Sequence, residues 1–473
     1  MIWTVFGLLL LAYANGQEIC LSGEEDPYLL FGTKTSYIFA NKIYPTTRIQ
    51  DIPGCQPIAI WLLSRHGSHN PEANETAGLQ SLTDLRNNIL TNYRNGNFRN
   101  TDQRICSSDL NLLERWSWSP GDPMLAGDLT SEGYISTQQL AQAWKNKYPG
   151  LLTDNPHDYL FKFGDDLRSS TSFRAFTEGL FKSQSGGNDV PKENDEKILR
   201  PYKFCNTWMN EVGDNNDTLV QKGTFESKQE YREMISNISK RLGFNYDVHR
   251  DVINSMYQMC RYDKAWNVAQ ISPWCAVFTK EDLKRIEYAE DLETYYKYGY
   301  GNSLNEKMGC TTLKDMMDFL KNHVEHDTPQ QPRVQIQFTE AATIMLTATA
   351  MGTRRDTTPL TGDNYHTPAV PTRQWTTSLM SPFSANIAAV LYKCTQDGNF
   401  QVKGEYQVLF LENEKPMKIE GCRVGLCDWN FVKNKFNEMT DSCDLQFCNN
   451  ASYIKGYASI VLIVTFFATI LNS

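Results

Sequence analysis

The sequence lacks any block of basic residues, and its 46 lysines and arginines are outnumbered by 55 aspartates and glutamates, which gives a net charge of −9. Because nucleic-acid-binding proteins present clustered lysine and arginine to the phosphate backbone, a nucleic-acid partner is not expected. Internal repeats and low-complexity tracts are also absent, which argues against a repeat architecture. An anionic ligand would have to be bound by a local cluster of arginines, since the overall field is negative.

Paired histidines are missing beside the closely spaced cysteines. The segments CRVGLC (Cys422, Cys427) and CDLQFC (Cys443, Cys448) have spacings that could suit a metal, but no histidine pair accompanies them, so we expect no metal site. With 473 residues and 41% hydrophobic residues, the chain can bury a sizeable core as two domains or as one large domain with insertions.

Residues 1–16 (MIWTVFGLLLLAYANG) form an apolar run that ends in small residues, as a secretory signal peptide does. A chain that enters the secretory pathway reaches an oxidising compartment, so its twelve cysteines are expected to form disulfides. The sequence therefore predicts an extracellular glycoprotein, with glycosylation sequons at Asn74, Asn216, Asn237 and Asn450.

The C-terminus lacks a hydrophobic run long enough to span a membrane. Residues 458–471 (ASIVLIVTFFATIL) are apolar but fall short of the roughly 20 residues that a membrane-spanning helix needs. Small residues and a short spacer precede this run, so residues 449–473 resemble a GPI-attachment signal, whose tail is removed. The sequence thus predicts membrane anchoring at the cell surface through GPI, with a direct hydrophobic anchor or a buried helix as the alternative.

Hydrophobic patterning predicts an α/β fold. Residues 58–63 (IAIWLL) read as a buried strand, and residues 334–338 (VQIQF) alternate as a strand does. The Ala/Met-rich stretch that follows predicts a helix that reaches Gly352, with Thr339 as its N-cap. Further strands are expected at 387–392 and 406–411.

Residues from about 186 to 320 are polar, aromatic and rich in helix formers, which is typical of a helical domain inserted into an α/β core. We therefore assign the chain to an α/β core with helical cap insertions. The core comprises residues 17–85, 125–185 and 325–448, and the cap comprises residues 86–124 and 186–324.

Arg65, His66 and Gly67 follow the first predicted strand almost directly. The carboxyl ends of strands are where open α/β sheets bind ligands. A histidine there can attack phosphorus and form a phosphohistidine, while arginines hold the charged oxygens and an acid protonates the leaving alkoxide. Taken alone, the tripeptide is more often an ordinary surface loop.

The wider sequence resembles the histidine acid phosphatases. GCQPIAIWLLSRHGSHNP is similar to their Arg-His-Gly-x-Arg-x-Pro signature, and LRSSTSFRAFTEGLF is similar to their second phosphate-binding stretch, with Arg168 at its arginine. SPWCAVFTKED, YYKYGYGNSLNEKMGC and FLENEKP resemble the multiple inositol polyphosphate phosphatase family specifically. The resemblance spans residues 55–448, and its five stretches fall in the family order.

This resemblance implies an α/β domain with a helical cap and an active site between them. It implies hydrolysis of phosphomonoesters without a metal or other cofactor, on substrates such as phytate, other inositol polyphosphates and 2,3-bisphosphoglycerate. In this chain His66 would be the nucleophile, and Arg65, His69 and Arg168 would bind phosphate.

Three positions depart from the family motifs. His69 replaces the second arginine of the signature and is shorter and only partly charged. A gapless alignment through VQIQF places Glu340 at the family's histidine and Ala342 at its acid, with Thr343 in register. Ala342 cannot donate a proton, and loss of a general acid costs about 10²–10⁴ in rate. A carboxylate at Glu340 would repel a phosphate oxygen by about 3 kcal/mol at ~5 Å and an effective dielectric near 20.

Milder interpretations exist for these positions. Glu340 can pair with Arg65 or Arg168, take up a proton in the cleft, complement the helix dipole as the first helical residue, or act as a displaced acid. His69 can be a solvated loop residue. We therefore keep three functions open: a slow inositol polyphosphate phosphatase, an inactive relative that binds anionic ligands or a protein, and a GPI-anchored interaction protein with a vestigial cleft.

Two further features are ambiguous. His326 and Asp327 could substitute for the missing His-acid pair, but they precede the strand in a Pro-rich segment and are better explained as a loop. A glycan on Asn74, eight residues after His66, can crowd the cleft or point to solvent.

Overall fold

The computed structural model describes residues 20–21, 26–42, 52–96, 104–118, 126–182, 190–326, 328, 331–395, 404–423 and 425–449. The predicted signal peptide, the sequon at Asn450 and the apolar run at 458–471 lie outside these residues. Among the residues described, no helix combines the length and the apolar character needed to cross a lipid bilayer.

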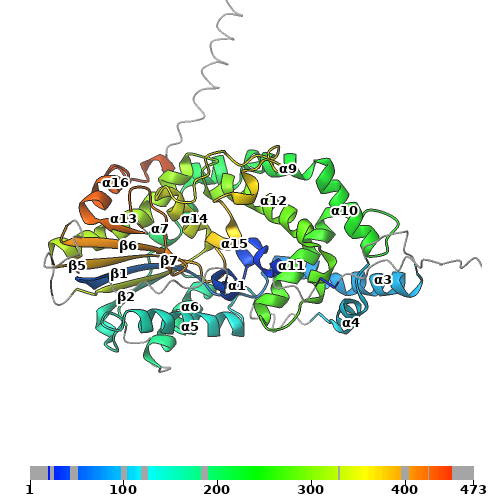
Figure 1. Cartoon of the computed structure of the whole chain (residues 1–473), viewed down its shortest axis with the longest axis horizontal. Coiled ribbons are helices and arrows are strands. Elements are labelled where there is room, and N and C mark those ends of the chain that lie inside the picture. Colours follow the sequence, from blue (N-terminus) through cyan, green and yellow to red (C-terminus); the bar gives the residue numbers. More distant parts are fainter. Residues whose placement is uncertain are drawn as a thin grey trace, which may run out of the picture.

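A mixed sheet forms the centre of the described chain (Figure 1), with strand order β3-β2-β4-β1-β5-β6-β7 and β8 paired to β6. Strands β2, β4 and β1 run parallel, and β5 and β6 run antiparallel to their neighbours. The predicted α/β fold and its four predicted strands are confirmed. The strands are β1 (Cys55–Arg65), β2 (Tyr159–Phe163), β3 (Lys192–Glu193), β4 (Val334–Thr339), β5 (Asn386–Cys394), β6 (Tyr406–Glu412), β7 (Lys415–Pro416) and β8 (Leu426–Asp428).

The parallel strands end together at one edge of the sheet. Arg65 at the end of β1 pairs with Thr339 at the end of β4, and Phe163 of β2 pairs with Phe338. Thr339 is thus still in the strand ladder, so its prediction as N-cap is wrong: Glu340 is the N-cap of helix α14 (Ala341–Ala350). The Arg-His-Gly loop and the start of α14 consequently lie side by side.

Helices cover both faces of the sheet (Figure 1). Helices α5 (Ser131–Lys147) and α6 (Leu167–Phe181) pack on the face that carries Ile60 and Leu62 of β1. Helices α13 (Leu304–Glu325), α14 and α16 (Trp429–Asp441) cover the opposite face. Helix α13 lies within the predicted cap insertion 186–324 yet packs against β1 and α14, so that insertion contains a core helix as well as cap helices.

The remaining long helices gather beyond the edge of the sheet where the parallel strands end (Figure 1). They are α2 (Ala73–Gln80), α3 (Leu82–Arg94), α4 (Ser107–Arg115), α9 (Val220–Glu226), α10 (Gln229–Arg241), α11 (Arg250–Trp266) and α12 (Lys280–Tyr298). Four short helices complete the described set: α1 (Tyr37–Lys42), α7 (Glu196–Leu199), α8 (Asn206–Trp208) and α15 (Thr377–Met380).

Disulfides join all twelve cysteines, as the even count predicted. Both closely spaced motifs contribute to them: Cys422 and Cys427 bond to each other, whereas Cys443 and Cys448 bond to distant partners. Such bonds persist in oxidising compartments, which indicates a secreted or lumenal protein. The pairs are Cys20–Cys106, Cys55–Cys394, Cys205–Cys448, Cys260–Cys275, Cys310–Cys443 and Cys422–Cys427.

Because a carboxyl is buried in the cap, we expect the protein to be more stable in mild acid than at alkaline pH. Burial, together with the charge of Asp291, raises the pKa of Glu287 on α12 to about 8, against the opposing charge of Arg373. A carboxyl with a raised pKa stabilises the fold below its unfolded pKa and loses that contribution as the pH rises through the folded value. Between about pH 5 and pH 8.5, wild type should lose roughly 2–4 kcal/mol relative to Glu287→Gln. Denaturant unfolding of both proteins across this range checks the prediction, and parallel curves would contradict it.

Candidate active site

His66 is held at the carboxyl end of β1 by the backbone on both sides. Its N–H donates to the carbonyl of Thr339 (3.0 Å), and its carbonyl accepts from the N–H of Ser384 (3.0 Å). Nδ1 of the buried ring lies 2.9 Å from the carbonyl oxygen of Gly67. Since a carbonyl can only accept, Nδ1 carries the proton and Nε2 keeps its lone pair. This is the tautomer that a nucleophile requires.

Close backbone packing brings α5 and α6 to the loop. A Cβ at Gly67 would lie 2.7 Å from the carbonyl oxygen of Gly133 on α5, and a Cβ at Gly133 would lie 2.1 Å from that of Ser68. The N–H of Gly67 donates to Oγ of Ser172 on α6 (3.1 Å). Only glycine fits at this crossing, and α6 is thereby positioned with its first turn beside His66.

Arg65 is a buried cation held by backbone carbonyls. Its Nη1 donates to the carbonyl of Ser381 (3.0 Å) and to that of Thr33, and its guanidinium lies 4.7 Å from the ring centre of Phe383. Burial, reinforced by the charge of Arg168, lowers the pKa of Arg65 to about 9. No ion pair from a described carboxylate neutralises it at contact distance, so an incoming anion would supply the missing counter-charge.

Arg168 lies in the first turn of α6, the helix that Ser172 ties to the His66 loop. Its charge is close enough to lower the pKa of both His66 and His69. Arg168 thus lies near both histidines, and its role as a phosphate ligand together with Arg65 stays a prediction. Nη2 of Arg168 is 2.9 Å from Oε1 of Glu72, a contact that the sequence did not predict.

His69 is buried, so its interpretation as a solvated loop residue is wrong. Its ring lies 5.2 Å from that of His66 and 5.4 Å from that of Phe383, measured between ring centres. Burial, followed by the charges of His66, Arg168 and Lys34, holds the pKa of His69 well below its usual range. His69 is consequently a neutral hydrogen-bonding group rather than a partial replacement for an arginine.

The same forces keep His66 neutral. Burial is the largest cause, the charges of Arg65 and Arg168 add to it, and together they lower the pKa of His66 well below its usual range despite the bond to Gly67. A neutral imidazole is the form that a histidine nucleophile needs, so these forces favour the role predicted for His66.

Lys34 is a cation of this region that sequence analysis missed. Its Nζ contacts Oε1 of Gln258 (2.7 Å) and Oε1 of Glu75 (3.2 Å), and lies 4.8 Å from the ring centre of Tyr262. Burial and the charge of Arg261 lower the pKa of Lys34 to about 8, with Glu75 opposing them. A single lysine in a short polar segment carries no signal that could have revealed this placement.

Glu340 is bound by three side chains of residues 200–203. It accepts from the hydroxyl of Tyr202, and its Oε1 contacts Nζ of Lys203 (3.1 Å) and Nη1 of Arg200 (3.5 Å). Although burial raises its pKa, the bond from Tyr202 and the charges of Lys203 and Arg200 lower the pKa of Glu340 overall. The suggestions that Glu340 pairs with Arg65 or Arg168, or is protonated in the cleft, are wrong.

Ala342 is buried in an apolar cluster that includes Tyr202, Trp208, Met308 and Leu346. Its methyl group has no proton to give, and no hydroxyl or carboxyl replaces it at this position. The position where the family has its proton donor is therefore occupied in this chain by an alanine that packs among apolar side chains. Of the other candidate pair, His326 is exposed as the C-cap of α13, and Asp327 lies outside the described residues.

Three of the four predicted glycosylation sites can be placed. Asn74, Asn216 and Asn237 are all exposed, which is compatible with attached glycans, although their modification stays a prediction. A close group of potential metal ligands, Cys20, Cys106 and Asp109, also occurs in the described chain. Both of its sulfurs form a disulfide, so this group offers no thiolate to a metal.

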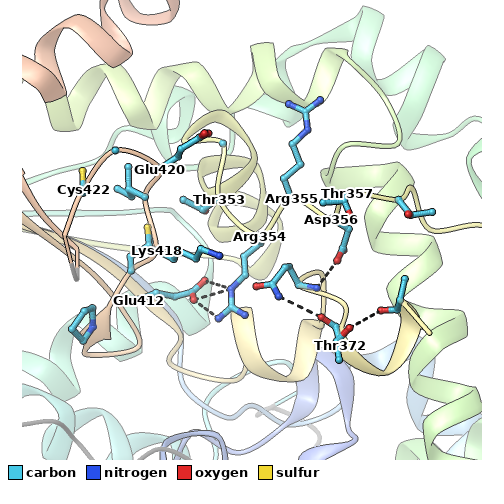
Figure 2. Close-up of a pocket in the computed structure, with 18 residues that line it drawn as sticks. Thr353, Arg354, Arg355, Asp356, Thr357, Thr372, Glu412, Lys418, Glu420 and Cys422 are labelled. Carbon is cyan, nitrogen blue, oxygen red and sulfur yellow. Dashed lines mark hydrogen bonds and ion pairs between the residues drawn. The ribbon is translucent and has the colours of Figure 1, made fainter. Parts of the chain in front are cut away.

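A separate cavity of about 880 Å³ lies beyond the end of α14 (Figure 2). Arg354, in the left-handed region with φ 59°, contacts both carboxylate oxygens of Glu412 through Nε (3.1 and 2.9 Å). The described residues that line this cavity include none of the predicted site residues. The ion pair neutralises Arg354, whereas Arg355 and Lys418 also line the cavity.

Comparison with known proteins finds similar sequences over most of the chain. The family model described as histidine phosphatase superfamily (branch 2) matches residues 59–407. Multiple inositol polyphosphate phosphatase 1 of Drosophila melanogaster is 33% identical over 425 residues, which cover 88% of this chain and 87% of the relative. The Homo sapiens protein of the same name is 27% identical over 440 residues, covering 88% and 87%.

Solved structures share the fold. The phytase from D. castellii superposes with a TM-score of 0.71 at 20% identity, over 90% of this chain and 89% of that one. The phosphate complex of Bifidobacterium longum multiple inositol polyphosphate phosphatase gives a TM-score of 0.61 at 13% identity, over 87% and 98%.

Proposed function

This chain belongs to branch 2 of the histidine phosphatase superfamily and to its multiple inositol polyphosphate phosphatase family, and from this premise we propose that it binds phosphomonoesters at His66 and hydrolyses them slowly through a phosphohistidine. The substrate class is that named for its relatives, the inositol polyphosphates. Arg65 and Arg168 bind the phosphoryl group, and His69 contributes as a neutral ligand.

The observation that carries the proposal is the pairing of a neutral imidazole with an uncompensated cation. Nε2 of His66 is free because Nδ1 is bonded to the carbonyl of Gly67. Arg65 is the neighbouring residue and is buried. Its Nη1 donates only to carbonyl oxygens, those of Thr33 and Ser381. A phosphate dianion would relieve the cost of burying this charge and would place phosphorus within reach of the nucleophile.

Slowness follows from the first chemical step, in which His66 attacks phosphorus, the P–O bond to the inositol breaks and the leaving alkoxide needs a proton. Glu340 is ionised and occupied by Tyr202, Arg200 and Lys203, so it has no proton to donate. Ala342 has none either. An inactive protein that only binds anions remains the second candidate, and the loss of the acid at Ala342 is the observation that favours it.

The test is to trap the intermediate with the full ectodomain. Brief incubation with ³²P-labelled nitrophenyl phosphate, whose leaving group departs without a proton, and a quench in base should leave acid-labile label on the protein, because phosphohistidine is stable in base and hydrolyses in acid. His66→Ala should carry none, whereas His326→Ala, an exposed histidine outside the site, should label as wild type does. Labelling that persists in His66→Ala would overturn the assignment of the nucleophile. Tight phosphate binding without label would favour the inactive candidate.

The membrane anchor is a further part of the proposal. Apolar residues 458–471 are too short to span a bilayer, which supports a GPI anchor on a protein of the secretory pathway.

A further inference from the structure

Glu72 places a carboxylate against Arg168, on the more exposed side of the site. Its Oε1 lies 2.9 Å from Nη2 of Arg168, and its side chain is 44% exposed, against 20% for the arginine. The carboxylate therefore lies on the solvent side of the phosphate-binding residue. The backbone N–H of Glu72 donates to Oε2 of Glu75 (2.9 Å), which fixes Glu72 at the start of α2.

Gly127 bounds the carboxylate on another side. A Cβ at Gly127 would lie 2.9 Å from Oε2 of Glu72, and the N–H of Gly127 donates to the carbonyl of Pro71 (3.1 Å). The Glu72 side chain is thus held between a backbone segment and Arg168. Its negative charge is therefore fixed in place beside Arg168.

A single phosphate and a polyphosphate meet this charge differently. Arg168 has five N–H donors, and the contact with Glu72 is made at Nη2, so one phosphate can share the guanidinium with the carboxylate. Neighbouring phosphates on an inositol ring extend outward from the reacting one, toward the exposed entrance. A phosphate next to the one bound by Arg168 would lie close to the Glu72 carboxylate, where like charges repel.

Nearby cations do not cancel this repulsion. Lys34 is bonded to Glu75, and Lys203 is bonded to Glu340. Each of these two lysines is accordingly balanced by its own carboxylate. Of these acidic groups, Glu72 is the one that contacts a predicted phosphate ligand directly.

We propose that Glu72 is a specificity-determining residue that favours phosphomonoesters with few neighbouring phosphates over fully phosphorylated inositols. The proposal rests on the proposed function, since it requires that the reacting phosphate be bound by Arg65 and Arg168. It narrows the substrate class toward the less phosphorylated members.

Calorimetric titration with two ligands that are not turned over tests this inference: orthophosphate and myo-inositol hexasulfate. Glu72→Gln removes the charge but keeps the shape. It should tighten hexasulfate binding at least about fivefold and orthophosphate binding by less than about twofold. Glu306→Gln is the matched control, because Glu306 is similarly exposed (37%) and lies 3.8 Å from Arg355, outside the site. It should change neither affinity.

Glu72→Asp provides a second variant that keeps the charge, and its ratio of the two affinities should stay close to that of wild type. An equal effect of Glu72→Gln on both ligands, or no effect on hexasulfate, would overturn the inference while leaving the proposed function intact. If neither ligand binds to any of these folded proteins, the proposed function fails and the inference fails with it.

Discussion

A nitrophenyl phosphate is expected to be turned over at least about 100-fold faster than phytate, because the two leaving groups differ in their need for a proton. His66 and the two arginines can perform the attack on either substrate. Nitrophenolate departs without protonation, whereas an inositol alkoxide in mild acid requires a donor. Ala342 lies in an apolar cluster and supplies none. Loss of a general acid typically costs about 10²–10⁴ in rate, and this cost should fall on phytate alone.

The comparison is made on kcat at saturating substrate, so that repulsion of phytate at the entrance does not enter the ratio. His66→Ala, measured in parallel, sets the background for both substrates. Phytate turnover at ordinary enzyme rates of about 1–10³ per second would contradict the prediction and require another proton donor. Glu340 is a poor candidate for that role, since its interactions with Tyr202, Lys203 and Arg200 lower its pKa.

The strands at the centre of the fold could be predicted because their pattern is local. IAIWLL and VQIQF are short apolar or alternating runs, and each is followed by residues that end the strand at the same edge of the sheet. The N-cap of α14 was misassigned because Thr339 pairs with Arg65 and bonds through its hydroxyl to the carbonyl of Leu199 (2.6 Å). That contact spans 140 residues and leaves no trace in the local pattern.

The charge states of the site residues could not be predicted from the sequence either, because they too depend on contacts between residues far apart in the chain. His69 is neutral because distant residues such as Phe383 and Tyr262 bury it. Lys34 is held near the site by Gln258 of α11. Glu72 is held there by Arg168 of α6. The motifs identify which residues can react, whereas tertiary packing decides which of them carry a charge.

Restoring a proton donor should repair phytate hydrolysis. Ala342→Glu combined with Glu340→His is expected to raise kcat for phytate at least about tenfold, while the rate with a nitrophenyl phosphate changes little. A carboxyl at position 342 would enter the apolar cluster around Trp208 and Met308, where burial raises its pKa and keeps it protonated in mild acid. The second substitution removes the carboxylate that now holds Arg200 and Lys203.

Ala342→Gln combined with Glu340→His is the matched control, because glutamine has the size of glutamate but no acidic proton. If proton donation is the missing step, the glutamine variant should stay as slow as the parent, and the gain of the glutamate variant should disappear as the pH rises through the pKa of the new carboxyl. Equal gains in kcat in the two variants would contradict proton donation by the new carboxyl and would make the replacement of Glu340 the cause. A fall in KM with kcat unchanged in both variants would instead indicate better phosphate binding, and adding His69→Arg should then lower KM further because a permanent cation binds phosphate more strongly than a neutral imidazole.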